Sequence, residues 1–267
     1  LDLVGIHAGR RLFTRFPMCK VGNRNRARNL DKKKGAEVIR ETEVTGIRLD
    51  GNRVVEVQTS RGHIATPLLV NAAGPWAKAI GRMCGVDVPV EPERRHIFIA
   101  SPPGGGSWDD GANAGRVPSN KLLVIDFDTS FYFHREGGGV LFGMGDPDEQ
   151  PGFDITVRWD FLPKVIEVAM QRLPALADAA VSHAWAGLYE MTPDHNPIIG
   201  PSSDVEGFYT IAGFSGHGFQ HAPAAGRILA DVIVGRDPHV VCVRILDELV
   251  HGLPQLFGPL YRRRQNL

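Results

Sequence analysis

A glycine-rich loop late in the chain, between an apolar strand and a helix, restricts the fold more than any other feature. The loop begins GFSGHG at Gly213, after the apolar run at residues 207–212 and before a helix expected at residues 223–234. Its glycines permit left-handed backbone and let N–H groups approach a flat ligand closely. The following helix adds the positive end of its dipole. A purely structural loop is the alternative, but the agreement of strand, loop and helix favours a ligand-binding loop.

The second feature is a turn between another apolar strand and a helix. After an apolar run at residues 68–70 the chain reads Asn-Ala-Ala-Gly-Pro-Trp over residues 71–76. Small residues let a ligand approach the backbone, Pro75 suits a first helical turn, and the exposed N–H groups there favour an anion. An ordinary strand-to-helix turn with a packing tryptophan is the alternative, and the motif taken alone favours it.

The third feature is the stretch WAGLYEMTPD at residues 185–194. Tyr189 combines an aromatic body with a hydrogen-bonding tip, which suits a residue that faces a substrate. Residues 192–194 predict a turn. From the residues alone, a structural role is the more frequent explanation for both.

Patterns along the rest of the chain predict an α/β (α+β) fold with a β-rich middle. Alternating apolar residues delimit the strands, together with turn residues such as Asp50-Gly51 and the glycines at 137–139. Strands are expected at residues 37–39, 44–49, 54–59, 64–70, 97–99, 122–127, 131–134, 140–142, 184–189, 198–201 and 207–212. Helices are expected after Pro75, at residues 160–173 and at residues 223–234.

Composition argues against several classes of function. The 30 Lys and Arg residues balance 30 Asp and Glu, which gives no argument for nucleic acid or an anionic membrane as a partner. No apolar run reaches the length of a membrane span. Three widely spaced cysteines indicate neither a disulfide framework nor a zinc site, and they fit a reducing compartment. His217 and His221 lack the glutamate of a zinc-binding helix, so no metal is expected.

Residues 1–34 form a basic segment with ten Lys or Arg side chains between Arg10 and Lys34. A basic, acid-poor leader is typical of an organelle transit peptide. An irregular surface segment is the alternative, which the absence of serine and the presence of Gly, Pro and Asn favour. The start at Leu1 is consistent with a fragment.

Taken together, the three motifs resemble the FAD-dependent D-amino-acid oxidase superfamily, over residues 35–238. The resemblance is to the branch with sarcosine oxidase β subunits, dimethylglycine dehydrogenases and related proline or glycine dehydrogenases. It implies a Rossmann-like FAD-binding domain beside a substrate domain with a mixed, largely antiparallel sheet. The FAD domain would comprise residues 35–84 and 185–238, the substrate domain residues 85–184, and residues 239–267 a tail without a family pattern.

The resemblance also implies the site residues. Tyr189 and Gln220 would act on the substrate, a small amine or amino acid. FAD would bind without a covalent link, because the stretch around Gly187 lacks the cysteine that carries flavin in monomeric sarcosine oxidases. The expected FAD contacts are Ala73, Gly74, Trp76, Gly187, Gly213, Ser215, Gly216, His217, Gly218, Phe219 and Gln220.

Several departures from the family pattern affect the expected function. No G-x-G-x-x-G turn is present, so the segment that binds the ADP half of FAD is expected to be missing. Leu141 matches a lysine that promotes reaction with oxygen, which favours a dehydrogenase. Gln220 matches a basic residue that holds the substrate carboxylate, and an amide cannot neutralise that charge.

The resulting prediction is an FAD-dependent oxidoreductase that oxidises the C–N bond of a sarcosine-, glycine- or proline-like substrate by hydride transfer to flavin. A non-catalytic subunit or assembly factor is the alternative, and a hetero-oligomer is open. The expected location is the cytoplasm, or the mitochondrial matrix in a eukaryote.

Overall fold

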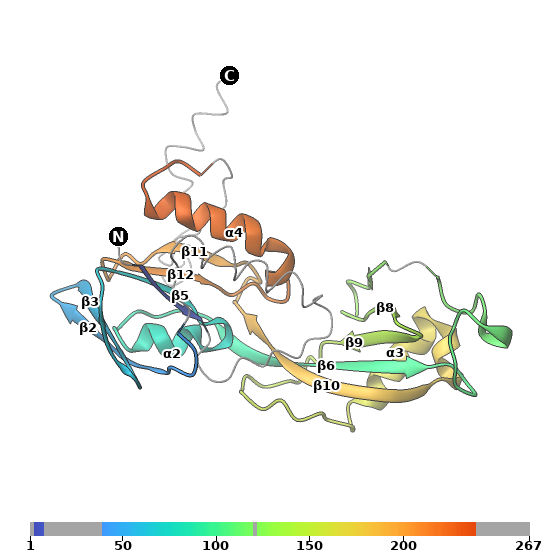
Figure 1. Cartoon of the computed structure of the whole chain (residues 1–267). Helices are drawn as coiled ribbons and strands as arrows, with labels where there is room; N and C mark the ends of the chain where they lie inside the picture. Colours follow the sequence, from blue (N-terminus) through green and yellow to red (C-terminus); the bar gives the residue numbers. More distant parts are fainter. Residues whose placement is uncertain (1–2, 8–38, 120–121, 239–267) are drawn as a thin grey trace, which may run out of the picture. The chain divides into compact units, whose positions relative to one another are not determined.

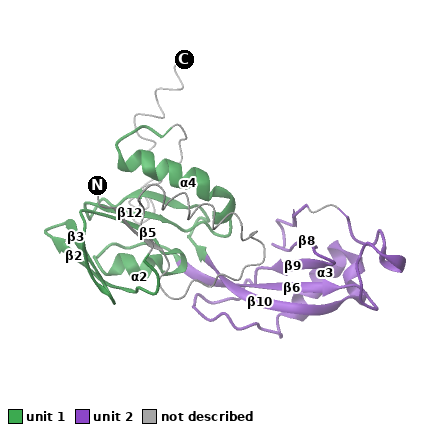
Figure 2. Cartoon of the chain, viewed as in Figure 1, with its two compact units in different colours: residues 1–90, 190–267 green, residues 91–189 purple. Residues whose placement is uncertain are grey.

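The computed structural model describes residues 3–7, 39–119 and 122–238 (Figure 1). The chain forms two compact units, coloured separately in Figure 2. Unit 1 comprises Leu1–Val90 and Glu190–Leu267, and unit 2 comprises Glu91–Tyr189. The boundaries lie five to six residues beyond those expected at 84/85 and 184/185. The first shift has a physical reason: Val86, Val88 and Val90 are buried in the core of unit 1.

The main sheet of unit 1 has the strand order β1-β5-β12-β11. β5 (Leu68–Ala72) lies between β1 (Leu3–His7) and β12 (Phe208–Ala212), parallel to both, while β11 (Ile198–Pro201) runs antiparallel to β12. Strand β1 falls in the segment expected to be an irregular leader, so that expectation is corrected at these five residues.

A three-stranded sheet of order β2-β3-β4 completes the β-structure of unit 1. β2 (Val44–Asp50) and β3 (Arg53–Thr59) form the expected hairpin, with Gly51 in the left-handed region of its turn. The single strand expected at 64–70 is wrong. It is β4 (Gly62–Ala65), paired with β3, followed by β5 in the other sheet. Pro67 separates them, because proline has no N–H to donate to a ladder. The strand expected at 37–39 lies mostly outside the described residues, and Ile39 is not in a strand.

Helices cover both faces of the main sheet of unit 1. Successive residues of a strand point to opposite faces. Leu69 packs with Ile80 of α2 (Ala77–Arg82), which follows the short 3-10 helix η1 (Gly74–Trp76). Val70 packs instead with Ile228 of α4 (Gly218–Ile233). Helix α4 begins five residues earlier than expected, with Pro223 inside it. Pro223 lacks the N–H that would pair with the carbonyl of residue 219, and Phe219 is exposed, so water can satisfy that carbonyl.

Unit 2 is a five-stranded sheet of order β10-β6-β9-β8-β7, antiparallel from β6 to β7. The strands are β6 (Glu91–Ser101), β7 (Val124–Ile125), β8 (Tyr132–Glu136), β9 (Gly139–Met144) and β10 (Ala180–Met191). The strand expected at 122–127 is reduced to two residues, while that expected at 184–189 extends to twelve. Short 3-10 helices η2 (Gly111–Asn113) and η3 (Pro174–Asp178) lie in the connections.

One face of this sheet is closed by α3 (Leu162–Arg172), close to the helix expected at 160–173 (Figure 1). Phe98, Phe133 and Phe142 from three strands form a core with Val165 and Ala169 of α3. The alternate residues of the same strands therefore point to the opposite face.

Candidate functional site

Asn71 fixes the turn that follows β5. Its side chain is completely buried; Nδ2 donates to the Ala77 carbonyl at 2.8 Å, and Oδ1 accepts the Ala73 N–H at 3.3 Å. These two bonds join the strand end to the first residue of α2. Gly74 between them has φ +56°, a conformation that favours glycine. The turn is thus held by one polar side chain at the end of an apolar strand.

The glycine-rich loop follows β12 with an unusual backbone. Gly213 and Gly216 have φ of +79° and +96°, and Ser215, which is not glycine, has φ +49°. The Ser215 hydroxyl donates to the Gly213 carbonyl at 3.3 Å and accepts the Thr192 N–H at 3.3 Å. Non-glycine residues in this region cost free energy and concentrate at functional sites.

Glu190 at the end of β10 connects this loop to the rest of unit 1. Its main-chain carbonyl accepts the Ser215 N–H at 3.1 Å, and Oε1 accepts the Phe214 N–H at 3.4 Å. Oε2 is buried and has no hydrogen-bond partner among the described residues. Burial raises the pKa of this carboxyl, opposed by the N–H groups of Gly213 and Phe214.

The Glu190 carboxyl also lies beside Gly74 of the Asn71 turn and Gly218 of the glycine-rich loop. A Cβ atom at Gly74 would lie 3.4 Å from Oε2, and one at Gly218 would lie 3.7 Å from Oε1. The Asn71 turn and the glycine-rich loop, more than 130 residues apart in the sequence, therefore meet at one buried carboxyl group.

Helix α4 begins within the same loop and exposes its N-terminus. His217 occupies the N-cap position without a capping side-chain hydrogen bond, and the first turn contains no acidic residue. Helix geometry leaves the first N–H groups without carbonyl partners, which favours an acceptor or anion there. Phe219 is 71 % exposed and Gln220 is also exposed.

A second polar cluster lies in unit 2, on the sheet face opposite α3. The guanidinium carbon of Arg95 on β6 lies 5.2 Å from the ring centroid of Tyr189 on β10. Tyr132 on β8 extends across β9: a Cβ at Gly143 would lie only 2.5 Å from its hydroxyl. Burial raises the pKa of both phenols by more than the nearby positive charge of Arg95 lowers it. The two hydroxyls therefore stay protonated at neutral pH and can donate hydrogen bonds.

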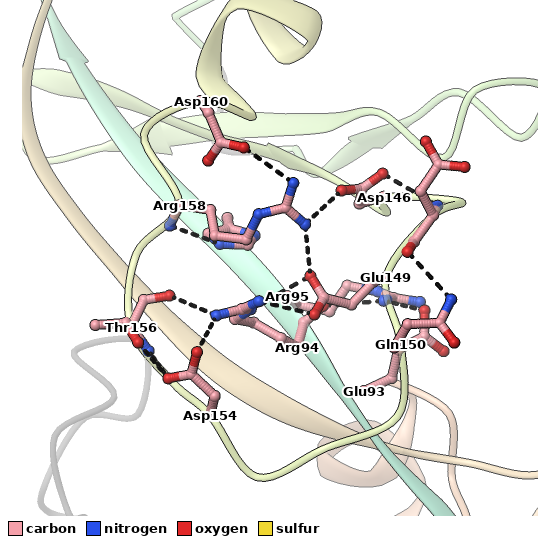
Figure 3. Close-up of polar contacts among 12 residues, drawn as sticks. Glu93, Arg94, Arg95, Asp146, Glu149, Gln150, Asp154, Thr156, Arg158 and Asp160 are labelled. Carbon is pink, nitrogen blue, oxygen red and sulfur yellow. Dashed lines mark hydrogen bonds and ion pairs between the residues drawn. The ribbon is translucent and has the colours of Figure 1, made fainter.

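An adjacent network of charges in unit 2 is shown in Figure 3. Arg94 donates two hydrogen bonds to Glu149 and one to Asp154, and Arg158 pairs with Asp146, Glu149 and Asp160. The side chains of Arg94 and Glu149 are 10 % and 6 % exposed. These groups satisfy one another and join the 146–160 segment to β6, which indicates a structural role.

The expected site residues divide between the two units. Unit 1 holds Ala73, Gly74, Trp76, Gly213, Ser215, Gly216, His217, Gly218, Phe219 and Gln220. Among them, Gly74, Gly213 and Gly218 contact or flank Glu190. Gly187 and Tyr189 lie on β10 within unit 2. Gly187 was expected within the FAD domain, and the structure places it with the other unit.

Sequence reasoning missed Glu190, Arg95 and Tyr132. Glu190 had one signal, an acidic residue at the end of a strand otherwise composed mainly of apolar and small residues. Arg95 lies in the run Glu93-Arg94-Arg95, where charge alone does not separate a site residue from a structural pair.

The family profile described as "DAO: FAD dependent oxidoreductase" matches residues 26–232. The chain belongs to this family. FAD-dependent oxidoreductase domain-containing protein 1 of Bos taurus is 33% identical over 214 residues, which is 71% of this chain and 41% of the relative. Mitochondrial sarcosine dehydrogenase of Mus musculus is 31% identical over 223 residues, 77% of this chain and 22% of the relative.

Among solved structures, the L-proline dehydrogenase from P. horikoshii superposes with a TM-score of 0.71 at 32% identity. The match covers 83% of this chain and 57% of that one. The chain thus spans less than two thirds of the length of these family relatives. Among the described helices, none is long and apolar enough to cross a membrane.

Proposed function

We propose that this chain is part of an FAD-dependent enzyme that oxidises the C–N bond of a small amine or amino acid of the sarcosine, glycine or proline kind. One observation carries the proposal beyond family membership. The Asn71 turn and the glycine-rich loop meet at the buried carboxyl group of Glu190, whose Oε2 has no hydrogen-bond partner among the described residues. A buried polar atom without a partner is costly unless a bound group satisfies it.

The residues of unit 1 fit FAD as that group. Glycines at 74 and 218 keep side chains away from the backbone beside the Glu190 carboxyl, so a flat ring can approach it. The uncapped N-terminus of α4 supplies N–H donors and a positive dipole end, which suit flavin carbonyl oxygens. We assign the FAD contacts Ala73, Gly74, Trp76, Ser215, Gly216, His217, Phe219 and Gln220 on this basis. FAD supplies the redox chemistry of C–N oxidation when bound.

The residues of unit 2 fit the substrate role. Tyr189 presents its ring to Arg95, and its phenol remains a donor at neutral pH because burial raises its pKa. Such groups bind and orient an amine substrate, which is the main contribution of the protein in this chemistry. We accordingly assign unit 1 as the FAD-binding domain and unit 2 as the substrate domain.

A non-catalytic subunit or assembly factor is the second candidate function. It is supported by the exposed amide of Gln220, at the position where the family resemblance places a basic residue. One relative, 30% identical, is the hydrogen cyanide synthase subunit HcnC of Pseudomonas protegens, which supports assembly with other subunits as a proposal. The mitochondrial sarcosine dehydrogenase relative supports a mitochondrial location if the source is eukaryotic.

The first test is an absorption spectrum of the purified protein after incubation with FAD and desalting. Retained flavin bands support the unit 1 assignment. Anaerobic titration with sarcosine, proline and glycine then separates the two candidate functions, because only an enzyme bleaches the flavin. Leu141 predicts slow peroxide formation and fast reduction of an artificial dye. Rapid peroxide production would contradict the dehydrogenase assignment.

A further inference from the structure

The two oxygens of the Glu190 carboxyl have different surroundings. Oε1 lies at the glycine-rich loop and accepts the Phe214 N–H at 3.4 Å, and the Gly213 N–H also hydrogen-bonds to the carboxyl. Oε2 is buried and has no hydrogen-bond partner among the described residues. Because Oε1 already accepts from the backbone, a proton on this carboxyl belongs on Oε2. Oε2 then becomes a buried donor that requires an acceptor.

No described cation compensates a negative charge on Glu190. Only burial and the backbone N–H groups of Gly213 and Phe214 shift its pKa among the described residues, and burial has the larger effect. The site therefore favours the neutral acid. The elements next to Glu190 carry other titratable side chains, none of which forms a described ion pair with it. They are His217 of the glycine-rich loop, His221 of α4, Asp194 and His195 of the turn after β10, and Lys78 of α2.

Gly74 in the Asn71 turn leaves space beside Oε2. A Cβ atom at Gly74 would lie 3.4 Å from Oε2, which is an ordinary contact distance. Apart from the two neighbouring residues of the turn, no other described atom lies within 4 Å of that position. The φ of +56° at Gly74 disfavours residues with a side chain, so this space stays free. An atom of a bound molecule placed there would contact Oε2 directly.

A flavin supplies the acceptor that a protonated Oε2 requires. Its isoalloxazine ring carries carbonyl oxygens and unprotonated ring nitrogens, all of which accept hydrogen bonds. A carboxylate at the same place would face these electron-rich atoms with a negative charge, in a buried site where such contacts cost most. The protonation state of Glu190 thus decides whether the contact is attractive or repulsive.

We propose that Glu190, in its neutral form, donates a hydrogen bond from Oε2 to an acceptor atom of the flavin, and that loss of its proton weakens flavin binding. The inference rests on the proposed function, to which it adds a residue that positions the flavin and a dependence of flavin affinity on pH. Glu190 holds the glycine-rich loop through Oε1 and the flavin through Oε2.

Proton linkage gives the direction of the pH effect. Only the protonated carboxyl donates, so flavin affinity is highest below the folded pKa of Glu190 and falls as pH rises through it. Each pH unit above that pKa should weaken binding by about tenfold, until the carboxylate form binds through its remaining contacts. Burial raises this pKa, so the loss begins at a higher pH than for an exposed glutamate.

The test measures binding of riboflavin and FAD to the whole chain from about pH 5 to about pH 9. Riboflavin has no phosphate groups, so its own charge stays constant over this range, and quenching of its fluorescence reports binding. Both flavins should bind at least about tenfold more weakly at the upper end. Calorimetry in buffers of different ionisation enthalpy should show proton uptake on binding at the upper end. Both measurements use the unsubstituted protein and need no variant to fold.

Glu190→Gln is the decisive variant. The amide keeps an acceptor for the Phe214 N–H and places a permanent N–H donor at the other position. It should match the riboflavin affinity of the unsubstituted protein at low pH, keep that affinity at high pH and take up no proton. Glu206→Gln is the matched control, because Glu206 lies in the same unit in an exposed pair with Arg53. This control should retain the full pH dependence.

A second pair of variants tests the space beside Oε2. Gly74→Ala places a methyl group in that space and should weaken riboflavin binding at every pH, by about 5- to 100-fold. Gly235→Ala introduces the same methyl at a similar φ of +71° with open space around it. It should leave riboflavin binding unchanged, which separates loss of the space from backbone strain.

The outcomes separate the role of Glu190 from the proposed function. Flavin binding that is independent of pH, that strengthens as pH rises, or that keeps its pH dependence in Glu190→Gln overturns the inference, while the oxidoreductase function stands. Failure of the unsubstituted protein to bind either flavin at any pH contradicts both. Binding whose pH dependence is abolished in Glu190→Gln, without bleaching by sarcosine, proline or glycine, supports the inference and contradicts the catalytic function.

Discussion

Alanine at position 213 tests how the glycine-rich loop is held. Gly213 has φ +79°, where a Cβ costs roughly 1–2 kcal/mol. The new methyl would also overlap Cγ2 of Thr192 and lie 3.3 Å from Cγ2 of Val90. Overpacking of this kind costs about 1–3 kcal/mol, so Gly213→Ala should destabilise unit 1 by about 2–5 kcal/mol.

Two other glycines supply matched controls for the two contributions. Gly235 has φ +71° with no atom near its Cβ position, so Gly235→Ala should show the backbone cost alone, about 1 kcal/mol. Gly226 lies inside α4 with open space around it, and Gly226→Ala should stabilise by up to about 1 kcal/mol. In free energy of unfolding, Gly226→Ala should therefore rank highest, Gly235→Ala next and Gly213→Ala lowest.

A double variant isolates the steric part. Thr192→Ser removes the overlapping methyl and keeps the hydroxyl that donates to the Asn196 carbonyl at 2.8 Å. Added to Gly213→Ala, it should recover about 1–3 kcal/mol of the loss, a coupling expected only between residues in contact. Urea unfolding with hydrogen exchange of β12 and α4 peptides reports on unit 1 alone. A Gly213→Ala loss no larger than that of Gly235→Ala would refute the reasoning.

Three further predictions concern burial and charge. Burial raises the pKa of Glu190, so the contribution of its protonated carboxyl to folding stability is complete below the unfolded pKa of about 4.3 and is lost as pH rises through the folded pKa. Over that pH range Glu190→Gln should become more stable relative to the unsubstituted protein. Parallel curves of urea midpoint against pH for the two proteins would contradict this. Burial raises the pKa of Cys84 to about 11, so peptide mapping at pH 8 should show iodoacetamide labelling of this thiol only after unfolding. Arg94→Ala leaves buried Glu149 short of a partner and should cost roughly 3 kcal/mol in thermal unfolding, whereas Arg53→Ala, which breaks an exposed pair, should cost at most about 1 kcal/mol.

Local chemistry made much of the fold predictable. The hairpin around Asp50-Gly51 and the turn at residues 137–138 depend on residues next to one another, and both form as expected. The expected strand at 64–70 was wrong because its two parts join different sheets, which no local pattern records. The start of α4 was misplaced because proline is favoured in a first helical turn, whereas Pro223 lies inside a helix that begins at Gly218.

In the candidate site, too, features that depend on neighbouring residues were predictable and features that depend on distant contacts were not. The glycine-rich loop was identified because left-handed backbone leaves a direct mark on the sequence. Glu190 and Arg95 leave no such mark, because their roles depend on contacts with residues far away in the chain. Glu190 meets Gly74 across more than 110 positions, and Arg95 meets Tyr189 across more than 90.

Strand β10 contributes residues to both units, because the boundary between the units lies between Tyr189 and Glu190. Tyr189 and Glu190 are consecutive, and a strand points consecutive side chains to opposite faces. Tyr189 accordingly packs with Arg95 in unit 2, while Glu190 contacts the Gly213–Phe214 backbone in unit 1. A single-residue insertion between them would shift the register and exchange these faces. One strand thus positions a phenol beside Arg95 in one unit and a buried carboxyl beside the glycine-rich loop in the other.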